Sequence, residues 1–159
     1  MIIVCYASPL IALSLCNKLE LLDTLFKEVV IPEWVYQEVS REGKAEAGKI
    51  AVWAQGKVQR VRKQPLFQAI NLSLDAGESE AITLYWEKAA DFLLIDEQRG
   101  RRIAAQNGIR IIGTLGILLL AKEKGLVDVI KPFLDQLWAS PIRISDSLYQ
   151  DILKLAGEK

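Results

Sequence analysis

The feature that most constrains this chain is the alternation of short apolar runs with stretches of helical spacing. Five runs have the length and composition of buried strands: 2–6, 28–31, 58–61, 91–96 and 109–112. Helical stretches separate them, and neighbouring parallel strands require crossovers of this kind. The pattern therefore predicts an α/β protein whose parallel sheet is covered by helices on both faces.

The expected helices have recognisable ends. Ser8 suits an N-cap and Pro9 a first helical position, and Asn17 separates two short helices within 10–26. The other helical stretches are 32–42, 44–55, 75–89, 97–108, 114–125, 126–140 and 145–158, while 62–73 is expected to be a loop. Because we find no linker or repeat, we expect one domain over 1–159 with a C-terminal helical extension at about 127–159.

Composition narrows the chemistry that this chain can perform. Its 159 residues include 20 basic and 20 acidic side chains and no histidine. Zero net charge gives no global attraction to nucleic acid or membrane, so such binding needs a local patch. Without histidine there is no Ser-His-Asp triad, Cys-His pair or histidine zinc site. Carboxylate chemistry remains, supported by Ser, Thr, Tyr, Lys and Arg.

The apolar stretches do not predict export or membrane insertion. The start of the chain is too short for a signal peptide and lacks a basic flank. The longest later stretch, 109–122, is interrupted by Gly113, Thr114 and Gly116. We therefore expect a cytoplasmic protein with no membrane contact, in which Cys5 and Cys16 are reduced core residues.

Acidic residues recur where a parallel sheet places its ligands, beyond the carboxyl ends of the strands. Asp96 follows an apolar strand, Glu78 lies in the first turn of the preceding helix, and Glu38 lies on the helix after the second strand. Oxygen ligands without histidine suit Mg²⁺ or Mn²⁺, which can activate water for phosphoryl displacement. Each acid also has a plain structural alternative: Glu78 and Glu80 suit a helix dipole, Glu38 a solvated helix face, and Asp96 an N-cap.

Several stretches in this order are similar to those of a known superfamily. They are "SPLIALSLCNKLELL", "VVIPEWVYQEV", "LDAGESEAITLY", "DFLLIDEQRGRRIA" and "IRIIGTLGILLLAKEKG", and they cover most of residues 2–126. The chain resembles the PIN-domain superfamily, in particular the small stand-alone PIN-like proteins of bacteria and archaea. The resemblance implies a three-layer α/β/α sandwich with a central, mainly parallel sheet, and a ribonuclease that depends on Mg²⁺ or Mn²⁺. In many relatives it also implies the toxin of a toxin–antitoxin pair, neutralised by a small antitoxin protein, and a homodimer.

The resemblance assigns roles to individual residues. The acids expected to be catalytic and to bind the metal fall on Glu38, Glu78 and Asp96, with Glu80 as the competing choice for Glu78. Supporting roles fall on Ser8, Glu97 and Thr114.

One position departs from the pattern, because Tyr6 stands where the family has its first aspartate, in a "Y-A-S-P" stretch. A phenol is uncharged at neutral pH and is bulkier than a carboxylate. Three interpretations stay open: the remaining acids hold one metal weakly, the protein is a degenerate member, or the substitution was introduced or selected because the active form is toxic. Tyr6 also suits a packed residue at a strand end.

Two groups of basic residues are candidates for RNA phosphate binding. The first is Arg99, Arg101 and Arg102 and the second is Arg60, Arg62 and Lys63. Arginine suits phosphate, although a solvated helix face paired with Glu97 explains the first group equally. The four tryptophans, at positions 34, 53, 86 and 138, have helical spacing and are expected in the core or at an interface.

These observations lead to one leading hypothesis and two alternatives. The leading one is a PIN-like, metal-dependent endoribonuclease whose activity is reduced or lost because Tyr6 replaces the first acid. The second is a non-catalytic PIN-fold binding protein that acts through protein–protein contacts. A small-ligand α/β protein ranks last because the chain lacks a G-x-G-x-x-G loop.

Overall fold

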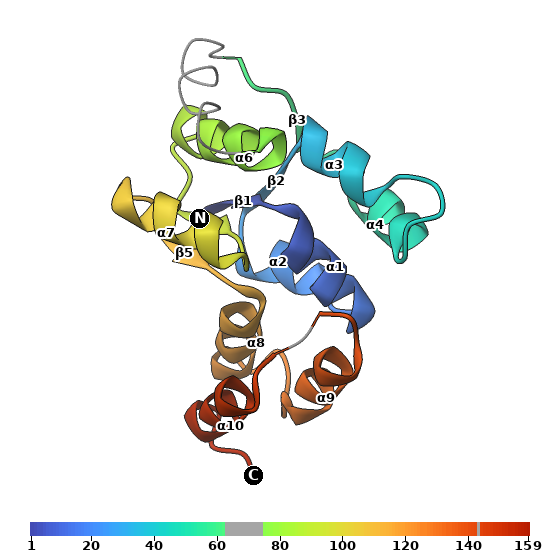
Figure 1. Ribbon diagram of the computed structural model, residues 1–159, viewed down its shortest axis with the longest axis vertical. Helices are drawn as coiled ribbons and strands as arrows, with labels where there is room; N and C mark the ends of the chain where they lie inside the picture. The colour runs from blue at the N-terminus through green and yellow to red at the C-terminus, as the bar shows by residue number, and fades with distance from the viewer. Residues whose placement is uncertain (63–74, 143) are drawn as a thin grey trace.

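A parallel sheet forms the centre of the molecule (Figure 1). The computed structural model describes residues 1–62, 75–142 and 144–159. Its strands are β1 (Ile2–Cys5), β2 (Glu28–Pro32), β3 (Val58–Gln59), β4 (Phe92–Leu94) and β5 (Ile111–Ile112). They follow the order β3-β2-β1-β4-β5, and every pairing between these strands is parallel. The predicted α/β fold is therefore confirmed.

β1 lies at the middle of this sheet and is buried on both faces. Ile3 pairs with Val29 of β2 on one side and with Phe92 of β4 on the other. Ile3, Val4 and Cys5 expose no surface. A strand covered on both faces needs a continuous apolar run rather than alternation, which is the pattern of residues 2–5.

Helices cover both faces of the sheet. In chain order they are α1 (Ala7–Leu15), α2 (Glu20–Leu25), α3 (Glu33–Val39), α4 (Ala47–Trp53), α6 (Ala76–Glu87), α7 (Gln98–Gln106), α8 (Thr114–Glu123), α9 (Lys131–Ala139) and α10 (Asp146–Leu155). Right-handed crossovers place α1 to α4 on one face and α6 and α7 on the other. In Figure 1, α6 lies above β1 and α7 to its left, whereas α3 and α4 lie to its right. The expected three-layer α/β/α sandwich is confirmed.

The ends of the early helices differ in detail from the prediction. Tyr6, not Ser8, is the N-cap of α1, because its extended backbone (φ −90°, ψ 172°) continues β1 directly into the helix. Ser8 therefore lies inside the first turn. Asn17, with φ 54°, separates α1 from α2 as predicted. Of the predicted loop 62–73, all but Arg62 lies outside the described residues.

The C-terminal helices pack against the sandwich at its lower end in Figure 1. α9 contacts α1, and α10 contacts α8. The Glu158 carboxylate accepts hydrogen bonds from the backbone N–H groups of Ile130 and Lys131 and from Lys122 Nζ. The last residues are thereby tied to the start of α9.

The two cysteines agree with their prediction as reduced core residues. Cys5 and Cys16 are free and buried. Burial raises the pKa of both thiols, that of Cys16 to about 11, so both stay protonated at neutral pH. Within the described part of the chain, every helix is too short or too polar to cross a bilayer.

Candidate functional site

The candidate site lies at the carboxyl ends of β1 and β4, where the strand order reverses. From β1 the sheet extends to β2 and β3 on one side and to β4 and β5 on the other. Such a switch point opens a crevice in parallel α/β sheets. Ser8 Oγ, in α1, donates a hydrogen bond to Glu97 Oε1, just before α7, at 2.9 Å. The helices that follow β1 and β4 are therefore joined across this crevice.

Tyr6 occupies the middle of this edge and is 4% exposed. Its backbone N–H donates to Leu94 O, which fixes it beside β4. Its hydroxyl donates to Asp75 Oδ2 at 3.1 Å. Burial, then the negative charges of Glu97 and Asp75, raise the pKa of Tyr6, so the phenol is neutral at physiological pH.

Asp75 is a site residue that the sequence reasoning missed. It is the N-cap of α6, where Oδ1 accepts from the backbone N–H of Glu78 at 2.8 Å and Glu78 Oε2 accepts from the Asp75 N–H at 3.3 Å. The Asp-x-x-Glu spacing of a capping box could have identified it. Asp75 thus links the start of α6 to the end of β1.

The two competing glutamates of α6 point to different neighbours. Glu78 is 3% exposed, and burial followed by the negative charge of Asp75 raises its pKa. Its Oε1 lies close to Gly100 of α7, 3.3 Å from the position of a built Cβ. Glu80 instead accepts from the Trp34 backbone N–H at 3.1 Å. Glu78 therefore faces the crevice and Glu80 faces α3.

Asp96 caps a helix, although not the one that follows it in the chain. Its Oδ1 accepts from the Thr114 backbone N–H at 2.8 Å and its Oδ2 from Thr114 Oγ1 at 2.6 Å. Thr114 is the first residue of α8. A Cβ on Gly113 would lie 2.7 Å from Asp96 Oδ1 and 2.6 Å from Arg101 Nη1, so the glycine makes room for both groups.

Glu38 completes the acidic surroundings of Tyr6. It is half-buried on α3, and its negative charge also acts on the Tyr6 hydroxyl. In residues 1–62, 75–142 and 144–159, however, no three acidic or cysteine side chains are close enough together to hold one metal ion. Tyr6 has no carboxylate to offer. In this arrangement the side chains do not fit a divalent cation.

The arginines of the two predicted basic groups have different surroundings. Arg99 and Arg102 are exposed on α7, whereas Arg101 turns inward and donates from Nη1 to Ile95 O at 3.1 Å. Arg60 pairs with Glu33 at 2.9 Å, near the start of α3. The Arg62 backbone N–H donates to Glu87, and Lys63 lies outside the described residues.

The tryptophans are more exposed than a core position allows. Trp34, Trp86 and Trp138 expose 49%, 45% and 47% of their surface. Trp53 is partly buried, and its Nε1 donates to Asp23. Of the two predicted locations, the core is excluded for the three exposed residues, and an interface stays a prediction. Helical spacing alone does not say which face of a short helix meets the sheet.

Comparison with known proteins agrees with this fold. The family model described as "DUF3368: PIN domain" matches residues 2–158. No curated protein and no solved structure matches the chain. PIN domains generally use divalent metal ions and commonly bind RNA. With its all-parallel sheet and a match over nearly its whole length, the chain belongs to the PIN-domain family and has that family's nuclease-type fold.

Proposed function

We propose that this chain is a PIN-domain endoribonuclease of the metal-dependent type whose activity is impaired by Tyr6. One observation carries the proposal: the hydroxyl of Tyr6, which by resemblance takes the place of the family's first acid, donates to Asp75 among the carboxylates of the site. Because the phenol is neutral, this edge of the sheet has one negative charge fewer than the family pattern. RNA is the proposed substrate class, and Mg²⁺ or Mn²⁺ the proposed cofactor of the active form.

In the active form, with a carboxylate at position 6, the proposed catalytic and metal-binding residues are Glu38, Glu78 and Asp96, supported by Ser8, Glu97 and Thr114. The Ser8–Glu97 and Asp96–Thr114 hydrogen bonds support this assignment, because they hold groups from α1, β4 and α8 at one edge of the sheet. Arg99, Arg101 and Arg102 are the proposed phosphate ligands. Tyr6→Asp would remove the ring and add a carboxylate beside Asp75 and Glu97.

The test is cleavage of single-stranded RNA in Mn²⁺ or Mg²⁺ by four proteins: the chain as it stands, Asp96→Asn, Tyr6→Asp, and Tyr6→Asp with Asp96→Asn. We expect only Tyr6→Asp to cut. Cutting by the unaltered chain that Asp96→Asn abolishes would show that three acids suffice. If folded Tyr6→Asp does not cut, the impaired-nuclease proposal is wrong.

The biological role follows from the same proposal. We propose a cytoplasmic toxin, homodimeric and neutralised by a small antitoxin protein, as the family resemblance implies. Expression of Tyr6→Asp should then arrest growth of the host cell, whereas the Tyr6→Asp, Asp96→Asn protein should not. Light scattering that gives a monomer at high concentration would refute the homodimer.

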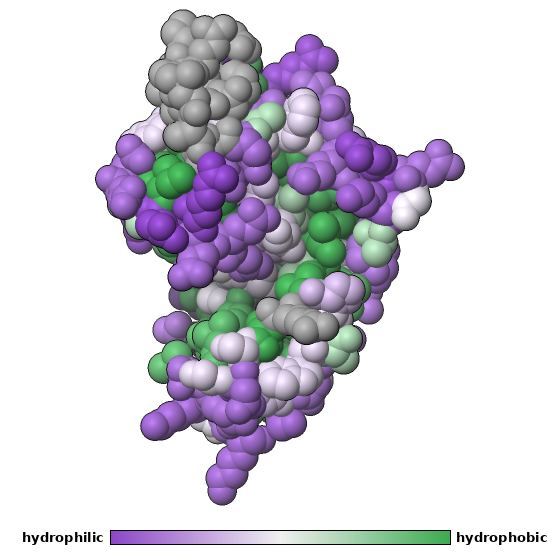
Figure 2. Space-filling view, viewed as in Figure 1, coloured by the Kyte–Doolittle hydropathy of each residue, from purple (hydrophilic) through white to green (hydrophobic). Residues whose placement is uncertain are grey.

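A second candidate function, a non-catalytic binding protein, rests on an apolar surface that adjoins Asp96 and Thr114 of the candidate site. A groove of about 610 Å³ runs beside α8 and α10, where Figure 2 shows hydrophobic surface. Its apolar lining includes Leu115, Leu119, Ile144, Leu148 and Ile152. The binding function is better supported than the nuclease function if Tyr6→Asp is folded and cleaves no RNA at any metal concentration.

A further inference from the structure

Trp34 places a half-exposed aromatic ring at the rim of the candidate site. It lies in the first turn of α3, where its backbone N–H donates to Glu80 Oε1. A Cβ built on Gly77 would lie 3.3 Å from Trp34 Cδ1 and 3.0 Å from Tyr6 Cε1. Both rings therefore pack against the same glycine, and 49% of the Trp34 surface still meets solvent.

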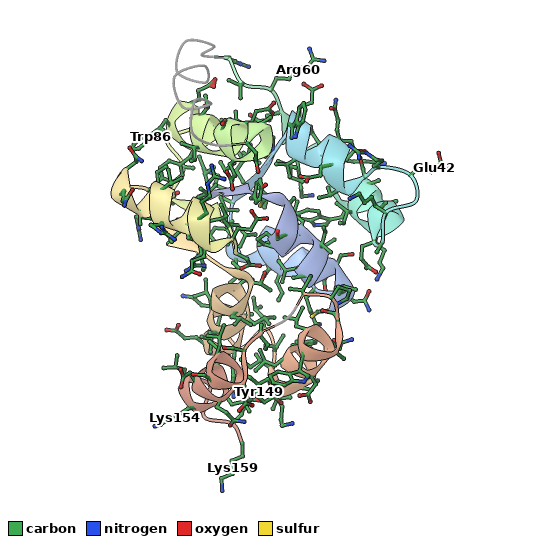
Figure 3. The ribbon with its side chains drawn as sticks, viewed as in Figure 1. Glu42, Arg60, Trp86, Tyr149, Lys154 and Lys159 are labelled. Carbon is green, nitrogen blue, oxygen red and sulfur yellow. The ribbon has the colours of Figure 1, made fainter. Side chains whose placement is uncertain are left out.

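Arg60 adds a positive charge near the start of the same helix. Its Nε pairs at 2.9 Å with Glu33, the residue before Trp34, while 81% of the Arg60 side chain is exposed. Figure 3 shows Arg60 at the top of the molecule, near the start of α3. A planar guanidinium can bind a phosphate oxygen while its Nε stays with a carboxylate.

We infer that Trp34 and Arg60 form a binding site for one unpaired nucleotide, whose base stacks on the indole and whose phosphate contacts Arg60. Aromatic faces stack on any base, which is how proteins commonly hold single-stranded RNA. Stacking supplies most of the affinity here, because Glu33 offsets part of the charge of Arg60 and the chain has no net charge. This inference rests on the proposed function for the identity of the substrate as RNA.

The site would hold the strand next to the acidic edge of the sheet. Trp34 and Tyr6 meet at Gly77, the residue before Glu78. A nucleotide stacked on Trp34 therefore places its neighbours along the strand close to Glu78 and Asp75. Trp34 is thus a positioning residue for RNA and takes no part in bond cleavage.

The test is fluorescence anisotropy of a labelled single-stranded RNA titrated with protein in EDTA, where no cleavage occurs. Base stacking on an aromatic ring corresponds to about a 5- to 150-fold change in Kd. We expect a loss in that range for Trp34→Ala and near-native binding for Trp34→Phe. Trp86→Ala is the matched control, because Trp86 is 45% exposed, packs edge-on against Tyr85 and lies across α6 from Arg60 (Figure 3).

An RNA with abasic sites separates stacking from charge attraction. The unaltered chain should bind this RNA more weakly than it binds intact RNA. Trp34→Ala should bind the two RNAs equally well. Unchanged binding by Trp34→Ala, equal binding of the abasic strand, or no RNA binding by the unaltered chain overturns the inference. Cleavage by Tyr6→Asp whose KM for RNA is unchanged by Trp34→Ala would refute the stacking site alone and leave the proposed function standing.

Discussion

At the scale of single residues, the Tyr6–Asp75 hydrogen bond ties the end of β1 to the start of α6. The Tyr6 ring is buried and its hydroxyl has a carboxylate partner at 3.1 Å. We expect Tyr6→Phe to lower the free energy of unfolding by about 1 kcal/mol, the usual worth of such a bond. Urea unfolding of Tyr6→Phe, Asp75→Asn and the double variant measures it, and strictly additive effects would show that the two groups do not interact.

The raised pKa of Glu78 predicts how the free energy of unfolding changes with pH. Burial makes the folded protein hold this proton more tightly than the unfolded chain does. The contribution of Glu78 to the free energy of unfolding is therefore largest at low pH. It declines as the pH rises from about 4 through the raised pKa of this carboxyl. Glu78→Gln keeps an acceptor for the Asp75 N–H but does not titrate.

We expect Glu78→Gln to gain stability relative to the unaltered chain as the pH rises from about 4 to about 7. Urea unfolding across this range measures the gain. Glu42→Gln, at an exposed position (Figure 3), controls for the loss of one negative charge. Parallel pH curves for the Glu78→Gln and unaltered proteins would contradict the assignment.

At the scale of elements, Asp96 connects the end of β4 to the start of α8, and Gly113 makes that contact possible. A Cβ at position 113 would stand within 2.7 Å of both Asp96 Oδ1 and Arg101 Nη1. We expect Gly113→Ala to lower the free energy of unfolding by about 1–3 kcal/mol through overpacking. Thermal or urea unfolding measures this loss.

Gly48→Ala is the matched control for this prediction. Gly48 lies inside α4, and a Cβ there would meet no atom within 4 Å. We expect it to stabilise the protein by about 0.5–1 kcal/mol, because alanine favours a helix over glycine. Equal effects of the two substitutions would mean that the crowding around Asp96 is absent.

At the scale of the whole molecule, we propose that residues 1–159 form one domain with a helical extension at about 127–159. Contacts of α9 with α1 and of α10 with α8, together with the Glu158 hydrogen bonds, support it. A single domain of this size is expected to unfold in one cooperative transition. Tryptophan fluorescence and far-UV circular dichroism should therefore give coincident urea curves. A separate transition at lower urea concentration would contradict this. If Trp138→Phe removes that transition from the fluorescence curve, the extension unfolds alone.

The fold was more predictable than the contacts within the site. Apolar runs and helical spacing are local properties, so the five strands and the break at Asn17 were found close to where the structure has them. Ser8 was assigned to the wrong cap position because the apolar pattern of residues 2–6 does not fix the residue at which β1 ends. The start of α1 therefore could not be located from the sequence. Trp34 was expected in the core or at an interface, and the choice stayed open because a short helix has too few turns to define its buried face.

By itself, the sequence determined the parallel α/β class, the exclusion of histidine chemistry, and the presence of a tyrosine where β1 ends. Only the tertiary structure decided that the Tyr6 hydroxyl meets Asp75, 69 residues further along the chain, that Asp96 caps α8 rather than α7, and that Trp34 shares Gly77 with Tyr6. Periodicity along a chain determines which elements form. The partner of each side chain depends on how distant elements pack, and that geometry leaves no pattern in neighbouring residues.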